Sequence, residues 1–307
     1  MKTVLITGGT GMIGSALIKE LIKNDYDVIV LTRDASRYKS TARLLYAEWN
    51  IKDETINTKA IGKADYIIHL AGANVAEKRW SKKRRKEIVD SRVQSGKLLV
   101  KALKEIPNKV KVVVSASAIG WYGPDAQTPN PKSFIETDNA ANGFLGTTCQ
   151  QWESAIQPVT QTGKRLVILR TGIVLSNDGG AFVEFKKPLQ FGVASILGNG
   201  KQIVSWIHID DLVRLYIYAI ENENISGIYN AVAPKPVTNK KLVLEIAKQQ
   251  NKFYLPVTVP SFVLKTVLGE MSIEVLKSAT VSSNKIASTG FHFLFSDIGT
   301  AVCNLVK

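Results

Sequence analysis

Cysteine and histidine are scarce in this chain of 307 residues, which contains two cysteines and three histidines. Cys149 and Cys303 offer neither a disulfide framework nor a cysteine-based zinc site. So few histidines also argue against a histidine-rich metal centre. We therefore predict no metal site, and the sparse use of cysteine is typical of the cytoplasm.

Long apolar runs are also missing. No segment approaches the roughly 20 apolar residues that a bilayer-spanning helix needs. The N-terminal MKTVLITGG leads into a glycine turn rather than a cleavage site. We therefore expect a cytoplasmic protein with no membrane partner.

Acidic residues are outnumbered, and the formal net charge is +14. The run SKKRRKE at residues 81–87 strengthens a nucleic-acid interpretation. The competing interpretation is a solvated helix face in a basic protein. We favour it, because aromatic residues do not alternate with these charges as in a stacking platform. We predict no nucleic-acid partner.

Short apolar runs alternate with helical patterns, which is typical of βαβ units and a parallel sheet. The longest helical pattern ends at Pro107. Asp210 or Asp211 is placed to cap one later helix, and Thr238 to cap another. The predicted strands include residues 2–6, 26–33, 64–72, 111–117 and 165–175.

The predicted fold class is α/β, with a Rossmann-type doubly wound parallel sheet and a smaller mixed C-terminal lobe. A chain of 307 residues accommodates one dominant domain and an appendage. We place the dinucleotide-binding domain in residues 1–175, completed by 203–232. The substrate lobe then comprises residues 176–202 and 233–307.

A glycine-rich turn, LITGGTGMIG at residues 5–14, lies between the first predicted strand and the first predicted helix. This context favours a phosphate-binding loop, because glycines let a pyrophosphate approach the free amides of the helix start. The spacing is GxxGxxG rather than GxGxxG. The predicted cofactor contacts in the loop are Gly8, Thr10, Gly11, Met12, Ile13 and Gly14.

Together with this loop, the segments HLAGA, SASAIGWYG, WIHIDDL and YNAVAPKPVTN resemble the extended short-chain dehydrogenase/reductases. More narrowly, the chain is similar to their atypical epimerase family along essentially its whole length. The resemblance implies a bound nicotinamide dinucleotide. It also implies cofactor contacts at Leu70, Ala71, Gly72, Glu87 and Arg92. For Glu87 and Arg92, an ordinary surface ion pair is the competing interpretation.

The second predicted strand ends at Thr32 and Arg33, where an NAD site usually carries an acid. Asp34 follows one residue later and stays open as that acid. A guanidinium at the strand end suits a 2′-phosphate, and the resemblance implies NADP(H) for members with arginine here. We therefore predict NADP(H) as the cofactor, bound through Arg33.

The tyrosine and lysine of the family, spaced YxxxK, are missing downstream of SASAIGWYG. Leu145 and Cys149 occupy the matching positions, and neither does the proton chemistry of that pair. We interpret Cys149 as a structural thiol rather than a nucleophile. The catalytic candidates are Ser117, with Ser115 as the alternative register, and Tyr122, for which packing beneath the lobe is the competing interpretation.

Arg170 ends another predicted strand, where it either meets an anionic substrate or anchors a loop. The predicted function is an NADP(H)-binding oxidoreductase or epimerase-like enzyme with an unidentified small-molecule substrate. The alternative is an NADP(H)-sensing regulatory protein that performs no chemistry. The missing Tyr-Lys pair favours the sensor, whereas a full substrate lobe favours the enzyme. A homodimer is the assembly considered for either.

Overall fold

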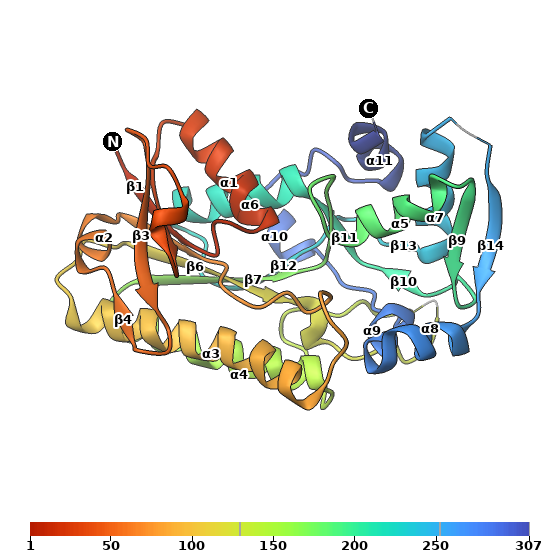
Figure 1. Cartoon of the computed structure of the whole chain (residues 1–307), viewed down its shortest axis with the longest axis horizontal. Helices are drawn as coiled ribbons and strands as arrows, with labels where there is room; N and C mark the ends of the chain where they lie inside the picture. Colours follow the sequence, from red (N-terminus) through yellow and green to blue (C-terminus); the bar gives the residue numbers. More distant parts are fainter. Residues whose placement is uncertain (129, 252, 307) are drawn as a thin grey trace.

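Eight strands form one central sheet in the computed structural model, which describes residues 1–128, 130–251 and 253–306 (Figure 1). Their order is β12-β7-β6-β5-β1-β2-β3-β4, and every pair is parallel except β3 with β4. The predicted α/β fold with a parallel Rossmann-type sheet is confirmed. The strands are β1 (Thr3–Thr7), β2 (Asp27–Thr32), β3 (Leu44–Asn50), β4 (Thr55–Ile56), β5 (Tyr66–His69), β6 (Val112–Ala118), β7 (Arg165–Thr171) and β12 (Gly227–Ala231).

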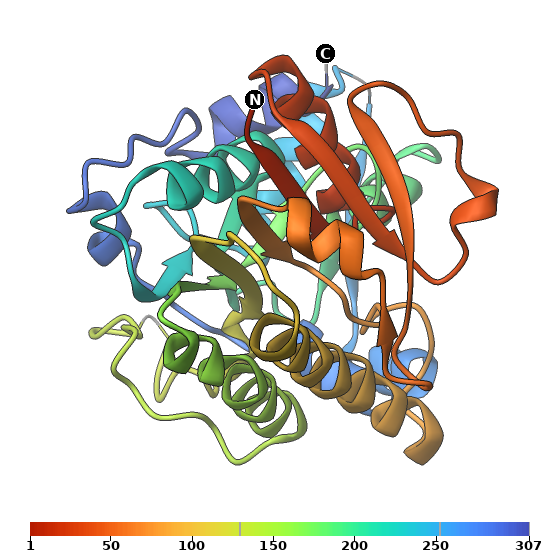
Figure 2. The same ribbon diagram turned by 90° about the vertical axis from the view of Figure 1, so that its left-hand side faces the viewer.

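Helices cover both faces of this sheet, so its central strands read as continuous apolar runs. Val4 and Ile6 of β1 are buried in one core, and Leu5 between them is buried in another, because side chains alternate along a strand. The first face carries α1 (Met12–Lys23) and α6 (Ile209–Glu221), and the second carries α2 (Thr58–Lys63), α3 (Lys82–Glu105) and α4 (Phe144–Ile156) (Figures 1 and 2).

A separate apolar core, which includes the fully buried Trp206, organises the opposite end of the molecule. We call this end the C-terminal lobe. Its core joins α5 (Ala181–Leu189), β9 (Val193–Leu197), α7 (Asn239–Gln249) and α11 (Ile298–Val306). The remaining elements are β8 (Ile173–Leu175), β10 (Ile203–Val204), β11 (Trp206–His208), β13 (Val237–Thr238), β14 (Leu255–Val259), α8 (Ser261–Leu268), α9 (Ser272–Leu276) and α10 (Asn284–Ala287). Across the described ranges, no helix has the length and apolar character needed to cross a membrane.

The predicted single strand at residues 165–175 is wrong. It breaks at Gly172 into β7 and β8, and β8 pairs with β11 outside the central sheet. A Cβ at Gly172 would lie 2.6 Å from the carbonyl oxygen of Ser205, so the close approach of that backbone requires glycine. The break separates the sheet from the elements that lead into the C-terminal lobe.

The start of α6 also differs from the prediction. His208 is its N-cap, and the Asp210 backbone N–H donates to His208 Nδ1 at 3.1 Å. Asp211 is instead fully buried, and its carboxylate accepts hydrogen bonds from the backbone N–H groups of Leu294 and Phe295 at 2.8 and 2.9 Å. Asp211 therefore ties α6 to the segment that precedes α11.

We predict that Asp211→Ala lowers the free energy of unfolding by about 2–4 kcal/mol, because it removes the charged acceptor of the Leu294 and Phe295 backbone N–H groups. Denaturant unfolding followed by circular dichroism measures the change. Asp210→Ala is the matched control, since the Asp210 side chain is 57% exposed, and it is expected to stay within about 0.5 kcal/mol. Equal effects at the two positions would contradict the prediction.

Candidate functional site

The glycine turn between β1 and α1 leaves the backbone amides of the helix start without a side-chain cap. Gly11 is the N-cap residue, and no side chain in the described part of the chain caps α1 there. Gly8 has a φ of +71°, and a Cβ on it would lie 2.9 Å from the Leu70 carbonyl. A Cβ on Gly14 would lie 2.5 Å from the Gly8 oxygen. This close packing keeps the turn tight beside the start of α1, and uncapped amides at a helix start are groups that attract anions.

The other predicted loop contacts lie in different surroundings. Thr10 is exposed, whereas Ile13 is half-buried and packs against the core under α1 and α6. The Met12 thioether faces the turn at Gly179 and Gly180, since a Cβ on either glycine would lie 3.6–3.7 Å from Met12 side-chain atoms. The glycine loop therefore meets the turn before α5, a contact that the sequence does not indicate.

Two residues that sequence reasoning missed, Thr7 and His69, shape the end of β5. Thr7 Oγ1 accepts hydrogen bonds from the backbone N–H groups of Leu70 and Ala71, both at 3.2 Å, and lies 2.8 Å from His69 Nδ1. Burial lowers the pKa of His69 to about 4, so the imidazole is neutral near pH 7. The sequence could have indicated this contact, because Thr7 and His69 are the last residues of two neighbouring parallel strands.

The structure brings together Gly72 and Arg92, two of the predicted cofactor contacts. A Cβ on Gly72 would lie 3.0 Å from the Arg92 guanidinium carbon. That guanidinium donates to the Ala73 carbonyl at 3.0 Å and lies over the Trp152 ring at 4.8 Å. Burial lowers the pKa of Arg92 to about 10, which still leaves it charged at neutral pH. Arg92 is therefore a cation beside the carboxyl end of β5.

Glu87 lies apart from this contact and accepts a hydrogen bond from Arg84 at 2.8 Å. Arg84 belongs to the run KKRRK, yet it is 5% exposed. It also donates to Glu77 at 2.8 Å and to the Asn74 carbonyl at 2.5 Å. One arginine of the basic run thus fastens the loop after β5 to α3, while the lysines around it are exposed.

Arg33 and Asp34, which follow β2, differ in their hydrogen bonds and ion pairs. Asp34 accepts from the Ser36 N–H at 3.1 Å and hydroxyl at 2.6 Å, and from Arg37 Nε at 2.8 Å. These hydrogen bonds lower the pKa of Asp34. Arg33 is exposed and forms neither a hydrogen bond nor an ion pair with any described residue. The carboxylate is committed to its own loop, and the guanidinium is available to a ligand.

A buried ion pair lies behind the predicted catalytic residues. Arg170 and Glu153 are 1% and 6% exposed, and Arg170 Nε and Nη2 donate to the two carboxylate oxygens of Glu153, both at 2.9 Å. The Ser117 hydroxyl donates to the same carboxylate at 2.6 Å. Arg170 also donates to the Glu136 carbonyl at 3.1 Å. Of the two roles open to Arg170, this geometry supports the anchoring one.

Tyr122 is fully buried and belongs to the same network. Its hydroxyl donates to Asn230 Oδ1 at 2.7 Å and accepts from Arg170 Nη1 at 3.1 Å. Its ring stacks on Phe134 with centroids 5.1 Å apart. Burial raises the pKa of Tyr122 to about 12. Both predicted catalytic hydroxyls, those of Ser117 and Tyr122, are thus engaged inside the protein, and their catalytic role stays a prediction.

Leu145 and Cys149 of α4, which we predict at the positions of the family's Tyr-Lys pair, are packed against the 3₁₀ turn at residues 119–121. A Cβ on Gly120 would lie 3.2 Å from Leu145 Cβ and 3.6 Å from Cys149 Sγ. The buried Cys149 thiol lies 3.6 Å from the Ala118 carbonyl, and burial raises its pKa to about 12. At neutral pH this thiol is protonated, so it is neither a nucleophile nor a source of positive charge.

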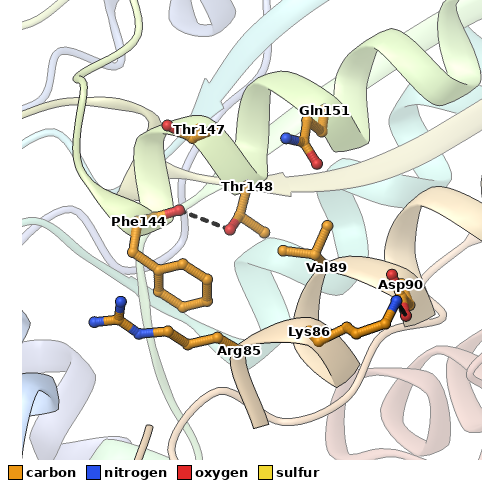
Figure 3. A pocket seen from close by; sticks show the side chains of 8 residues that line it. All are labelled: Arg85, Lys86, Val89, Asp90, Phe144, Thr147, Thr148 and Gln151. Atoms are coloured by element: carbon orange, nitrogen blue, oxygen red, sulfur yellow. Dashed lines mark hydrogen bonds and ion pairs between the residues drawn. The ribbon is translucent and has the colours of Figure 1, made fainter. Parts of the chain in front are cut away.

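The outer surface has a hollow of about 320 Å³ between α3 and α4 (Figure 3). It is lined by Arg85, Lys86, Val89, Asp90, Phe144, Thr147, Thr148 and Gln151. None of the predicted cofactor contacts is among them. Among the described residues, no cluster of three or more His, Cys, Asp or Glu side chains is arranged to hold a metal ion.

Comparison with known proteins extends over the whole chain. The family described as "NAD dependent epimerase/dehydratase family" matches residues 4–231, and a "Domain of unknown function (DUF1731)" matches residues 259–305. An epimerase family protein of Staphylococcus aureus strain MRSA252 is 36% identical over 308 residues, which cover 100% of both chains.

Two solved structures are also similar. Human epimerase family protein SDR39U1, solved with NADPH, has a TM-score of 0.87 at 26% identity, covering 99% of both chains. UDP-glucuronic acid 4-epimerase from Bacillus cereus, solved with UDP-glucuronic acid and NAD, has a TM-score of 0.80 at 20% identity. That match covers 99% of this chain and 98% of the epimerase, and it shows likeness of fold alone.

We predict that Arg170→Met lowers the free energy of unfolding by about 3–5 kcal/mol, because it leaves the Glu153 carboxylate buried without its partner. The double variant Arg170→Met/Glu153→Leu is the control. It removes both charges, so we expect it to be more stable than the single variant in denaturant titrations. A double variant less stable than the single one would contradict this account of the pair.

A second prediction concerns pH. The unfolded chain protonates His69 near pH 6.5, but the folded chain does so only near pH 4. Stability is therefore lost as pH falls from about 6.5 to 4, by up to roughly 3 kcal/mol from this residue. We expect His69→Gln to flatten the difference in unfolding free energy between pH 7 and pH 4.5. His292→Gln, at an exposed histidine, is the control, and it should leave that difference unchanged.

Proposed function

The chain belongs to the NAD-dependent epimerase/dehydratase family, and from this premise we propose that it is an NADP(H)-dependent oxidoreductase or epimerase-like enzyme. Its substrate is a small molecule. The proposed cofactor contacts are the glycine loop, the segment Leu70 to Gly72, Arg33, Glu87 and Arg92. Ser117 and Tyr122 remain the proposed catalytic candidates, in a chain that lacks YxxxK.

The contrast between Arg33 and Asp34 is the observation that carries the choice of NADP(H). An NAD site uses an acid near this point to accept hydrogen bonds from the ribose hydroxyls. Asp34 already accepts three hydrogen bonds from Ser36 and Arg37. Arg33 has a free guanidinium, which suits the 2′-phosphate of NADP(H). The NADPH bound to human SDR39U1 supports the same choice.

In this proposal Arg92 supplies a positive charge at the nicotinamide end of the cofactor. The family's lysine provides a positive charge close to the nicotinamide ribose, and Cys149 cannot replace that charge. The Arg92 guanidinium, packed between Gly72 and Trp152, is a permanent charge on the neighbouring helix. It binds and orients the cofactor in this proposal, but it does not supply a proton.

The second candidate function is an NADP(H) sensor without chemistry. It is favoured by the internal hydrogen bonds that occupy the Ser117 and Tyr122 hydroxyls. The two functions share the cofactor site and differ in turnover. Two assays of the intact protein separate them: oxidation of NADPH with a panel of carbonyl substrates, and inversion of configuration with a panel of chiral alcohols. An oxidoreductase gives the first change, a redox-neutral epimerase gives the second, and a sensor gives neither.

We predict that Arg33→Ala weakens NADPH binding by about 1.5–3 kcal/mol, or roughly 10- to 150-fold, and leaves NADH binding nearly unchanged. Calorimetric titration of cofactor-stripped protein with NADPH, NADP+, NADH and NAD+ measures both. Lys63→Ala is the charge-matched control, because Lys63 is exposed at the end of α2. Equal losses for the two reduced cofactors would contradict the role of Arg33, and a wild-type protein that binds no dinucleotide would refute the proposed function.

A further inference from the structure

Two phenylalanines project from the outer end of the C-terminal lobe. Phe191 follows α5 and is 85% exposed, and Phe253 precedes β14 and is 81% exposed. The two lie side by side, because the Leu255 N–H donates to the Gly192 carbonyl at 2.8 Å and a Cβ on Gly192 would lie 3.5 Å from the Phe253 carbonyl oxygen. Side chains of this size are rarely left in water without a binding role when they cluster.

Strand β14 lies along the edge of the molecule (Figure 1). Leu255 and Val257 are 57% and 44% exposed. Within the described ranges β14 pairs only with β9 and adds no buried residue to the core of the lobe. We call Phe191, Phe253, Leu255 and Val257 the apolar tip.

The two segments that carry the apolar tip are rich in lysine and poor in acidic residues. Residues 181–202 and 235–265 contain nine lysines, no arginine, no aspartate and two glutamates, so these two segments carry half of the net charge of +14. Lys240, Lys241 and Lys248 line one hollow of the lobe together with Tyr254 and a single acid, Glu245. All three lysines are exposed, and none forms an ion pair with a described residue.

The same geometry disfavours a second copy of the chain as the partner. The Leu255 N–H and the Val259 carbonyl both bond toward β9, so the alternate residues Pro256 and Thr258 direct their backbone groups to the free edge. Pro256 has no N–H, which makes this edge a poor template for another strand. Two copies of so basic a surface would also repel each other.

We propose that the apolar tip and its lysines form a docking surface for an anionic lipid bilayer. Phe191 and Phe253 enter the boundary between headgroups and acyl chains, and Lys240, Lys241 and Lys248 lie against the headgroup phosphates. This combination of apolar side chains and flanking lysines is what holds a protein at an anionic interface without a spanning helix. The proposal departs from the sequence-based expectation of no membrane partner, and it does not depend on the cofactor.

The test is co-sedimentation of the full chain with vesicles of phosphatidylcholine, with or without about 30% phosphatidylglycerol. We expect sedimentation with the anionic vesicles only, and less of it as salt rises, because salt screens the lysines. Phe191→Ser/Phe253→Ser should lower the vesicle partition coefficient by at least about tenfold. Lys240→Gln/Lys241→Gln/Lys248→Gln should lower it by about 100-fold at low salt.

Two variants away from the surface are the controls. Lys82→Gln/Lys83→Gln/Lys86→Gln removes the same charge from exposed lysines of α3, and Leu294→Ser removes a side chain that is 59% exposed elsewhere. Both should sediment like the wild-type chain. The proposal is overturned if wild-type protein stays in the supernatant, or if the controls lose binding equally. It is also overturned if Phe191→Ser/Phe253→Ser changes the molecular mass of lipid-free protein by light scattering, since the tip would then join copies.

Discussion

The buried ion pair between Arg170 and Glu153 is the interaction that holds Ser117 and Tyr122, the two catalytic candidates, in place. Two charges removed from water are stable only when their geometry is good and their remaining hydrogen-bonding groups are satisfied. Here Ser117, Tyr122 and the Glu136 carbonyl satisfy them. Through these partners the pair links β6, β7, α4 and the segment after β6, so their relative positions are fixed together.

Much of the fold follows from local pattern, and the exceptions have long-range causes. The Thr238 cap of α7 is confirmed, with Thr238 Oγ1 accepting from the Lys241 N–H, because a cap needs only its own first turn. The break at Gly172 depends on the Ser205 carbonyl, which arrives from another part of the chain. The sequence pattern does not reveal such an approach. It predicts neither β3 nor β4, and half-buried or exposed residues make up most of both strands.

The candidate site also has features that the sequence predicts and features that depend on long-range contacts. Sequence spacing locates the glycine loop, and the family resemblance implies a cofactor contact at Gly72. The structure adds that Arg92 lies against Gly72. The sequence does not reveal that Asp34 is hydrogen-bonded to Ser36 and Arg37. An aspartate at a strand end is consistent both with a ribose-binding acid and with an acid that stabilises its own loop. The run KKRRK illustrates the limit for charge. Its pattern indicates a solvated face, but Arg84 turns inward to two carboxylates and a carbonyl.

The hydrogen bonds that Ser117 and Tyr122 make with the Arg170–Glu153 ion pair limit the chemistry that the proposed enzyme can perform. Freeing the Ser117 or Tyr122 hydroxyl for a substrate means withdrawing a hydrogen bond from a buried charge, which costs about 1.5–3 kcal/mol for each such bond. Deprotonating Tyr122 at neutral pH costs more still, because its pKa is raised to about 12. A bound substrate must offset these costs or bring its own proton donor. Reactions whose barrier lies in hydride alignment, rather than in proton removal by the protein, therefore suit this site best.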